Sequence, residues 1–182
     1  IVIPVRKGST RCKNKNIRDF GNSNLLKLKI ETLKKVKGVD RILVSSDCNK
    51  MLQIATDLGV DIHKRDEKYC TTECSGSEFM TNLAEQVLTE YFIYSTCVTP
   101  LIDSNQIEKC INNINKLNSS YDSIVLANIT KQFMWDYEKP INYKLDNAPP
   151  SQELPEYYIP NFACCLSKTS SVIKNNNVIG KT

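Results

Sequence analysis

The sequence predicts an α/β fold, a Rossmann-like three-layer α/β/α arrangement around a mostly parallel sheet. Two observations lead to this prediction: short apolar runs rich in β-branched residues recur along the chain, and segments with helical spacing separate them. Because strands that alternate with helices form βαβ units, we expect helices on both faces of the sheet. At 182 residues and 41% hydrophobic content, one domain with a substantial core is expected.

Five runs are predicted to be buried strands, because each is apolar and enriched in β-branched or aromatic residues. They are IVIPV at 1–5, RILVSS at 41–46, VDIH at 60–63, YFIYST at 91–96 and DSIVLAN at 122–128. In parallel sheets, ligands bind outside the carboxyl ends of the strands. The loop that follows IVIPV is therefore in the right place for a site.

Two segments between these runs carry helical periodicity. Apolar residues recur at i, i+3, i+4, i+7 and i+10 at Ile107, Cys110, Ile111, Ile114 and Leu117. Asp103 and Ser104 precede this stretch as possible N-caps. A second helix is predicted through Phe79, because Ser75 followed by Glu78 has the spacing of a capping box.

The segment from about 129 to 161 is predicted to be irregular. It contains KQFMWDYEKPINY and PPSQELPEYYIP, which are rich in aromatic residues and prolines and lack helical periodicity. Irregular segments of this length often shape a substrate pocket, so we expect an insertion or flap within a single domain that spans 1–182.

The composition excludes several classes of protein. The net charge is only +4, from 24 basic and 20 acidic residues, which is not typical of a nucleic-acid or membrane binder. No apolar stretch approaches the ~20 residues that span a bilayer. The eight cysteines form no C-x-x-C pair, which favours reduced, buried thiols, and Cys70 with Cys74 lacks the two further partners of a zinc site. We expect a soluble cytoplasmic protein.

The loop after the first strand concentrates positive charge. No acidic residue precedes Asp19, whereas six basic residues fall before it: Arg6, Lys7, Arg11, Lys13, Lys15 and Arg18. Gly8 lets a backbone approach an anion closely, and Ser9 adds a small hydroxyl donor. Arginine forks and lysine point charges together suit a triphosphate, although a solvated basic loop is the plain alternative.

Other phosphate and nucleophile motifs do not match. A dinucleotide fingerprint needs three closely spaced glycines, and the terminal GKT has Asn175 where a Walker A motif needs its first glycine. His63 is the only histidine and lies beside Lys64, away from a distinctive Ser or Cys motif, so we interpret it as a structural or pocket-wall residue. Direct transfer from a bound nucleotide fits better than nucleophilic catalysis.

The motifs resemble those of the sugar-acid cytidylyltransferase family, closest to the acylneuraminate cytidylyltransferases. RKGSTRCKNKN is similar to the family signature R-x-G-S-x-x-x-x-x-K-N. In the same order along the chain, RILVSSD resembles a strand that ends in V-S-T-D, and DIHKR the strand that follows it. YSTCVTPL resembles the Q-x-T-S-P-L turn, while YDSIVLANITKQFMW and PPSQELPEYYIPN resemble the sugar-site region.

The resemblance implies a nucleotidyltransferase domain and a reaction. The anomeric hydroxyl of a 2-keto sugar acid attacks the α-phosphate of CTP with Mg²⁺ assistance, giving a CMP-sugar and pyrophosphate. It also implies a homodimer, formed through the region after the sheet. A nucleotide- or sugar-binding homologue without turnover is the alternative, and a nucleic-acid-binding module lacks the interleaved aromatic residues that it would need.

By residue, the resemblance and the charge pattern assign catalysis to Arg6 and Lys15. The expected nucleotide-binding residues are Arg6, Gly8, Ser9, Arg11, Lys15, Asn16, Arg65 and Thr96. The expected sugar-acid contacts are Gln152 and Trp135. The alternatives are an exposed Arg65 that pairs with Asp66 or Glu67, and a Gln152 that only orders its proline-rich loop.

Departures from the family pattern raise further expectations. Thr96 replaces the glutamine of the Q-x-T-S-P-L turn, and Ser151 replaces an arginine, which favours a keto sugar acid other than sialic acid. Phe162 and Cys165 replace the glycine and tyrosine of an N-G-x-x-Y motif. The family's D-x-D carboxylates for Mg²⁺ are expected beyond Thr182, so we expect the C-terminal part to be missing.

Overall fold

The computed structural model describes residues 1–8, 12–117 and 120–180. The chain divides into two compact units, the larger formed by Ile1–Leu126 with Phe162–Thr182 and the smaller by Ala127–Asn161. Each unit is described by itself. Within the described residues, no helix has the length and apolar character needed to cross a membrane.

A six-stranded sheet has the order β5-β4-β1-β6-β8-β7. Its strands are β1 (Val2–Pro4), β4 (Leu43–Ser46), β5 (Asp61–Lys64), β6 (Tyr91–Tyr94), β7 (Ser123–Thr130) and β8 (Tyr157–Lys168). β1 pairs in parallel with β4 and β6, β4 pairs in parallel with β5, and β8 is antiparallel to β6. The prediction of a mostly parallel sheet is confirmed.

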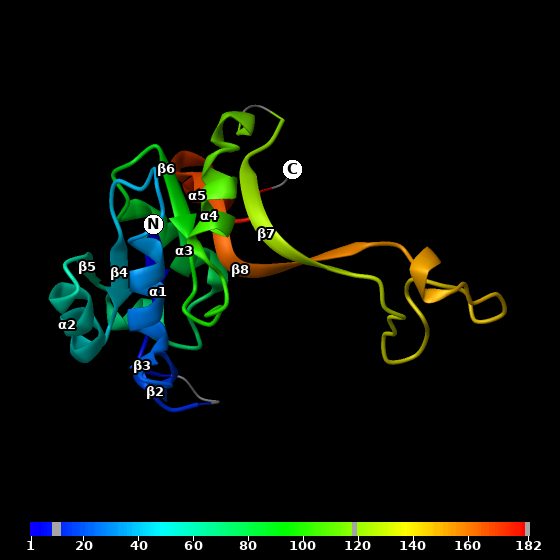
Figure 1. The fold of residues 1–182 in the computed structure, drawn as a ribbon, viewed down its shortest axis with the longest axis horizontal. Helices are drawn as coiled ribbons and strands as arrows, with labels where there is room; N and C mark the ends of the chain where they lie inside the picture. Colours follow the sequence, from blue (N-terminus) through cyan, green and yellow to red (C-terminus); the bar gives the residue numbers. More distant parts are fainter. Residues whose placement is uncertain (9–11, 118–119, 181–182) are drawn as a thin grey trace. The chain divides into compact units, whose positions relative to one another are not determined.

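Helices and short turns connect the strands (Figure 1). The α-helices are α1 (Leu25–Leu33), α2 (Asn49–Asp57), α3 (Gly76–Glu85), α4 (Ser104–Ile111) and α5 (Thr169–Asn175). The 3-10 helices are η1 (Lys15–Ile17), η2 (Glu67–Cys70), η3 (Ile114–Lys116) and η4 (Ser151–Glu153). A small hairpin pairs β2 (Asp19–Phe20) with β3 (Ser23–Asn24).

Side-chain hydrogen bonds to the backbone mark the start of α3 and the end of α4. Ser75 and Glu78 form the predicted capping box of α3. The periodicity through Leu117 was expected to continue one helix, but α4 ends at Ile111 and η3 follows it. The side-chain amide of Asn113 donates to the Lys109 carbonyl, and such local bonding competes with a continuing helix.

The core fills both faces of the sheet, as three layers require. On one face Ile3, Val44 and Ile93 pack with the buried sides of α1, α2 and α4. On the other face the neighbouring residues Val2 and Phe92 pack with α3 and α5. Because adjacent strand residues point to opposite faces, this alternation confirms the three-layer α/β/α prediction.

The strand β8 is absent from the sequence-based prediction. The pattern placed 129–161 in an irregular segment, whereas β7 continues to Thr130 and β8 begins at Tyr157. Prolines surround and interrupt this stretch, as at Pro155 and Pro160, and they obscure a strand pattern because proline lacks the donor of a ladder bond.

The smaller unit is built from local turns. Trp135 forms an isolated bridge with Pro140, and the Ile141 amide donates to the Met134 carbonyl over 2.9 Å. The Asp136 carboxylate closes the turn between them, accepting two backbone N–H groups at 2.8 Å. The helix of this unit is the short η4. Short-range contacts therefore shape the turns of this unit, while the ion pair of Lys131 with Glu156, at 3.4 Å, links residues farther apart in the sequence.

Candidate functional site

The ends of three parallel strands are tied together around the opening loop. The Arg65 guanidinium donates from Nη2 to the Val5 carbonyl over 2.7 Å, which joins the ends of β5 and β1. The Lys7 amide donates to Asp47 Oδ1 over 3.1 Å, which joins β1 to the end of β4. Asp47 ends the run RILVSSD, and the sequence pattern had assigned it no role. The loop is thus anchored at the carboxyl edge of the sheet, as predicted.

Arg6 holds the loop to the end of η2. Its Nη1 donates to the carbonyl oxygens of Cys70 and Thr71, the latter over 3.3 Å. In the described part of the chain, no protein acceptor engages Arg6 Nε or Nη2. The side chain is half-buried, so part of its fork stays available for an anion.

Arg65 is buried, with 2% of its surface exposed. Its Nε lies 2.9 Å from Cys70 Sγ, and its guanidinium carbon lies 4.9 Å from the centre of the Phe79 ring. The alternative of an exposed Arg65 paired with Asp66 or Glu67 is therefore wrong. Nη1 is buried without a hydrogen-bond partner among the described residues, and a nucleotide contact there requires the side chain to open toward the ligand.

Lys15 stands half-buried at the start of η1, and this turn contacts α1. Burial raises the pKa of the nearby Cys97 thiol to about 12, and the positive charges of Lys29 and Lys15 oppose that rise. The positive charges of two ammonium groups thus influence the pKa of one buried thiol just beyond β6. Asn16 is half-buried in the same turn.

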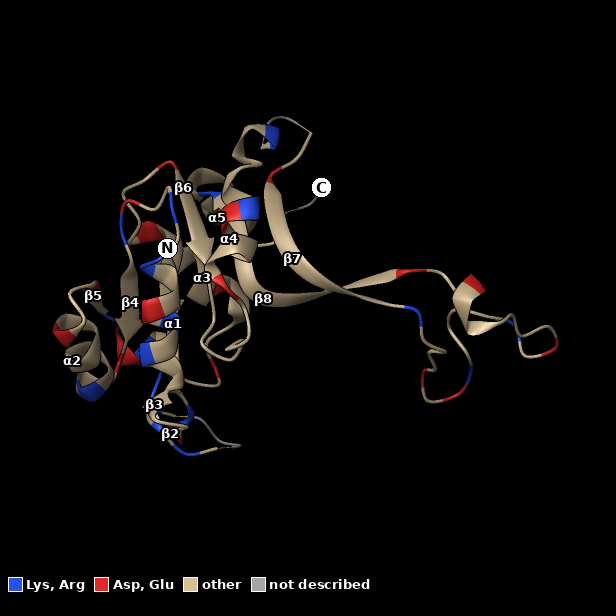
Figure 2. Cartoon of the chain, viewed as in Figure 1, with Lys and Arg blue, Asp and Glu red and all other residues tan. Residues whose placement is uncertain are grey.

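Basic positions recur through the segment that leads into β2 and β3 (Figure 2). Gly8 is exposed, and a Cβ built there would meet open space. Packing within the described residues therefore does not require a glycine at this position. Ser9 and Arg11, which were predicted to bind the nucleotide, lie outside the described residues.

Two hydrogen bonds join Thr96, just after β6, to the backbone of Phe162. The Thr96 amide and hydroxyl both donate to the Phe162 carbonyl, over 3.0 and 3.2 Å. Phe162 has a φ of 56°, a left-handed conformation that favours glycine. Its ring packs edge-on against Tyr94 with 6.2 Å between ring centres. The chain thus keeps a glycine-like conformation at the position where the resembled motif has glycine.

The predicted sugar-acid contacts belong to the smaller unit. Trp135 is half exposed and donates from Nε1 to the Tyr143 hydroxyl over 2.6 Å. The Gln152 side chain lies on the exposed surface of η4, and its carbonyl accepts from Lys131 Nζ over 3.2 Å. This bond gives Gln152 a part in ordering its loop. The two assignments to sugar binding stay predictions.

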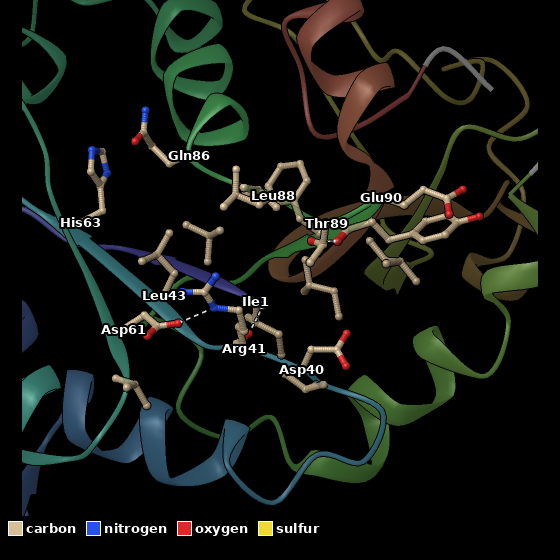
Figure 3. A pocket seen from close by; sticks show the side chains of 18 of the residues that line it. Ile1, Asp40, Arg41, Leu43, Asp61, His63, Gln86, Leu88, Thr89 and Glu90 are labelled. Atoms are coloured by element: carbon tan, nitrogen blue, oxygen red, sulfur yellow. Dashed lines mark hydrogen bonds and ion pairs between the residues drawn. The ribbon is translucent and has the colours of Figure 1, made fainter.

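A cavity of about 900 Å³ lies at the opposite, amino edge of the parallel strands (Figure 3). Its lining includes Leu43 and Glu90 at strand starts, and an Arg41–Asp61 ion pair of 2.7 Å at its wall. None of the residues predicted to bind the nucleotide lines it. Because ligands of parallel sheets bind at the carboxyl ends, we place the candidate site at the loop and not in this cavity.

His63 lines that cavity, as expected of a pocket-wall residue. Its Nδ1 lies 3.0 Å from Ser45 Oγ on the neighbouring strand. Burial, followed by the charge of Arg65, lowers the pKa of the imidazole. Ser45 is fully buried, so its hydroxyl cannot reach a substrate as a nucleophile.

The described residues do not assemble a protein-only metal site. Across 1–8, 12–117 and 120–180, no three His, Cys, Asp or Glu side chains converge to hold an ion. Of the acidic side chains beside the loop, Asp47 accepts the Lys7 amide and Glu67 lies 3.9 Å from Lys7 Nζ. All eight cysteines are free thiols, of which Cys97, Cys110, Cys164 and Cys165 are buried. The donor set of the described residues therefore does not fit Mg²⁺ by itself.

A family model described as cytidylyltransferase matches residues 1–147. The chain belongs to the cytidylyltransferase family. This assignment confirms the resemblance found in the opening loop and in the motifs that follow it. The match includes all of the strand ends that hold the loop.

Two curated proteins are similar to this chain over far more than the loop. The uncharacterized protein MJ1063 of Methanocaldococcus jannaschii is 27% identical over 143 residues, covering 74% of this chain and 56% of that protein. The N-acylneuraminate cytidylyltransferase of Escherichia coli is 24% identical over 188 residues, covering 99% of this chain and 44% of that protein. The chain thus spans about half the length of these relatives.

Solved cytidylyltransferase structures share the fold. A CMP:2-keto-3-deoxy-manno-octonic acid synthetase complexed with CTP superimposes with a TM-score of 0.69 at 14% identity, covering 96% of this chain and 75% of that one. A 4-diphosphocytidyl-2C-methyl-D-erythritol synthase from Anaerococcus prevotii gives 0.66 at 14% identity, covering 96% and 74%. At these identities the likeness establishes the nucleotidyltransferase fold, as predicted, and leaves the acceptor open.

Proposed function

We propose that this chain carries the nucleotide site of an enzyme that transfers CMP from CTP to a 2-keto sugar acid and releases pyrophosphate. One observation carries the proposal. In a chain of the cytidylyltransferase family, the basic opening loop is anchored at the carboxyl edge of the sheet by Arg65, Asp47 and Arg6. That edge is where parallel sheets bind nucleotides.

The chemistry needs positioning and charge neutralisation more than a protein nucleophile. The anomeric hydroxyl oxygen of the acceptor forms a bond to the α-phosphorus, and the bond from that phosphorus to the bridging oxygen breaks. The electron pair leaves with pyrophosphate, and the hydroxyl proton passes to solvent. Because negative charge grows on the leaving group, cations held in advance at the phosphates lower the barrier.

Arg6 and Lys15 are proposed to supply these cations. Arg6 is already fixed by its bonds to the η2 carbonyls, so little conformational freedom is lost when its remaining donors meet phosphate oxygens. Lys15 lies at the start of η1, close to the turn after β6. The proposal includes Mg²⁺ bound with the nucleotide, whose phosphates are ligands that this ion prefers.

The acceptor is proposed to be a nonulosonic acid, such as sialic, legionaminic or pseudaminic acid. The E. coli N-acylneuraminate cytidylyltransferase, at 24% identity over 99% of this chain, supports the class. Ser151 in place of an arginine favours an acid other than sialic acid. Gln152 and Trp135 are the proposed contacts, and a cytoplasmic homodimer that uses the segment from about 129 to 161 is part of the proposal.

One observation favours a second candidate, a homologue that binds CTP without transferring it. The Thr96 hydroxyl donates to the Phe162 carbonyl, so its proton is not available to the base edge that a glutamine would contact. In such a protein the loop would still hold triphosphate while the catalytic alignment is lost.

Pyrophosphate release separates the two candidates. The complete protein is assayed with Mg²⁺ and each of the four nucleoside triphosphates, against sialic, legionaminic and pseudaminic acid and 2-keto-3-deoxy-manno-octonic acid. Release with CTP and one acid is the expected result. CTP binding without release from any pair supports the second candidate, and neither binding nor release contradicts both.

A further inference from the structure

A buried lysine lies on the inner side of α1, the first helix after the opening loop. Lys29 has 2% of its surface exposed and shares the buried side of the helix with Leu26, Ile30 and Leu33. These positions are spaced at i, i+3, i+4 and i+7, so they form one apolar stripe with a single ammonium in it. Folding alone favours an apolar residue at such a place.

The ammonium is bonded to the turn that follows β6. Lys29 Nζ donates to the Thr99 carbonyl over 3.3 Å and to the Thr99 hydroxyl over 3.1 Å. The Thr99 hydroxyl in turn donates to the Thr96 carbonyl over 3.1 Å. Lys29 therefore fixes the turn that carries Thr96, which is a predicted nucleotide contact. The Thr96 hydroxyl also donates to the Phe162 carbonyl.

Among the residues that the structure describes, no carboxylate pairs with Lys29. In the described part of the chain, no ion pair includes Lys29, and an ammonium has three donors, of which two are used here. The titratable groups that influence the pKa of Lys29 are the thiols of Cys97 and Cys164. Lys15, from η1, acts on the same Cys97 thiol. Two lysines thus influence the same thiol, and neither belongs to an ion pair among the described residues.

We propose that Lys29 is a positioning residue of the nucleotide site, which holds the Thr96–Thr99 turn and whose charge is balanced when the phosphates of the nucleotide bind. This inference rests on the proposed function. A buried ion pair or ion is often replaced by an apolar residue without loss of stability, so retention of an unpaired ammonium here points to a ligand of opposite charge.

The electrostatics add a signature of binding. Burial lowers the pKa of Lys29 in the ligand-free protein. A bound polyanion stabilises the charged form and raises that pKa again. At a pH between the two values, binding must therefore take up a proton, and CTP affinity must fall as the pH rises from the lower value to the higher one.

The test compares Lys29→Met with Lys29→Arg and with Lys27→Met, a control at an exposed position of the same helix. CTP is titrated calorimetrically into the complete protein at several pH values below the ordinary lysine pKa of 10.5, each in two buffers of different ionisation enthalpy, and thermal unfolding is followed in parallel. Lys29→Met is expected to bind CTP about tenfold more weakly, to lose the proton uptake and to keep or raise its melting temperature. Lys29→Arg should retain most of the affinity, and Lys27→Met should match the unchanged protein.

The outcomes separate this inference from the proposed function. If the unchanged protein binds CTP and Lys29→Met binds it equally well, the role of Lys29 is overturned and the proposed function stands. If Lys29→Met does not fold, the test rests on the unchanged protein, whose binding enthalpy in the two buffers reports proton uptake. CTP binding without proton uptake overturns the inference. If the unchanged protein does not bind CTP, the proposed function fails and the inference fails with it.

Discussion

The contacts within the larger unit differ in kind from the contacts within the smaller unit. In the larger unit, the candidate site is tied by bonds between residues far apart in the sequence, such as Arg65 with Val5 and Lys7 with Asp47. In the smaller unit, the turns are closed by neighbours, such as Asp136 with Glu138 and Trp135 with Tyr143. The comparison indicates that the candidate site is positioned by the tertiary fold, whereas the smaller unit contains locally ordered turns that can vary in sequence at little cost to the fold.

Substitution of Arg6, in the larger unit, is expected to have the largest effect, which is a loss of turnover. Arg6→Ala removes the guanidinium that anchors the loop to η2 and is proposed to meet the phosphates, so turnover should fall by about 100-fold or more. Lys7→Ala is the matched control, because the Lys7 side chain is exposed and pairs with Glu67 only at 3.9 Å. Pyrophosphate release measures both variants, and small, equal losses would remove the role of the loop.

Removal of Arg65 tests the rigidity of the larger unit. Arg65→Met retains most of the volume but leaves the Val5 carbonyl without its partner, which should lower the free energy of unfolding by about 2 kcal/mol. Urea denaturation gives the value. Stability equal to that of the unchanged protein would mean that the strand ends do not depend on this bond.

The left-handed backbone at Phe162 predicts a difference between two variants. Phe162→Gly and Phe162→Ala both lose the contact with Tyr94, but only glycine adopts a φ of 56° without steric cost. The glycine variant should therefore be more stable than the alanine variant by about 1 kcal/mol. The reverse order in thermal unfolding would show that this position is not strained.

Substitution in the smaller unit should have the smallest effect on stability. Gln152→Ala removes an exposed side chain and leaves the bond from Lys131 to its carbonyl in place, so the free energy of unfolding should change by less than about 0.5 kcal/mol. CTP binding should be unchanged, while the KM for the sugar acid rises. A loss of CTP affinity in calorimetry would contradict the separation of roles between the units.

Regular patterns made much of the larger unit predictable. The apolar runs that became β1, β4, β5, β6 and β7 alternate with helical segments, and Ser75 with Glu78 marked the start of α3. The strand β8 could not be predicted because prolines precede and interrupt its first part, and because its residues 165–168 pair antiparallel with β6 without a helical crossover. The position of the loop at the carboxyl edge followed directly from the parallel order.

Single side chains were harder to predict than elements. The burial of Arg65 depends on Phe79 and on the Val5 carbonyl, which only tertiary folding brings together. Lys29 was missed because a lysine inside a helical stripe resembles an ordinary interruption until its bond to Thr99 is seen. The resemblance marked Phe162 as unusual, but its left-handed conformation is a property of the folded backbone.

The most direct test of the central claim is calorimetric titration of CTP into the complete protein, with UTP, ATP and GTP as matched controls. The account predicts saturable binding of CTP, with UTP weaker because it differs at the base edge alone, and loss of the CTP signal in Arg6→Ala. Equal binding of all four nucleotides, or CTP binding that survives the loss of Arg6, would contradict a cytidine-nucleotide site built on the opening loop.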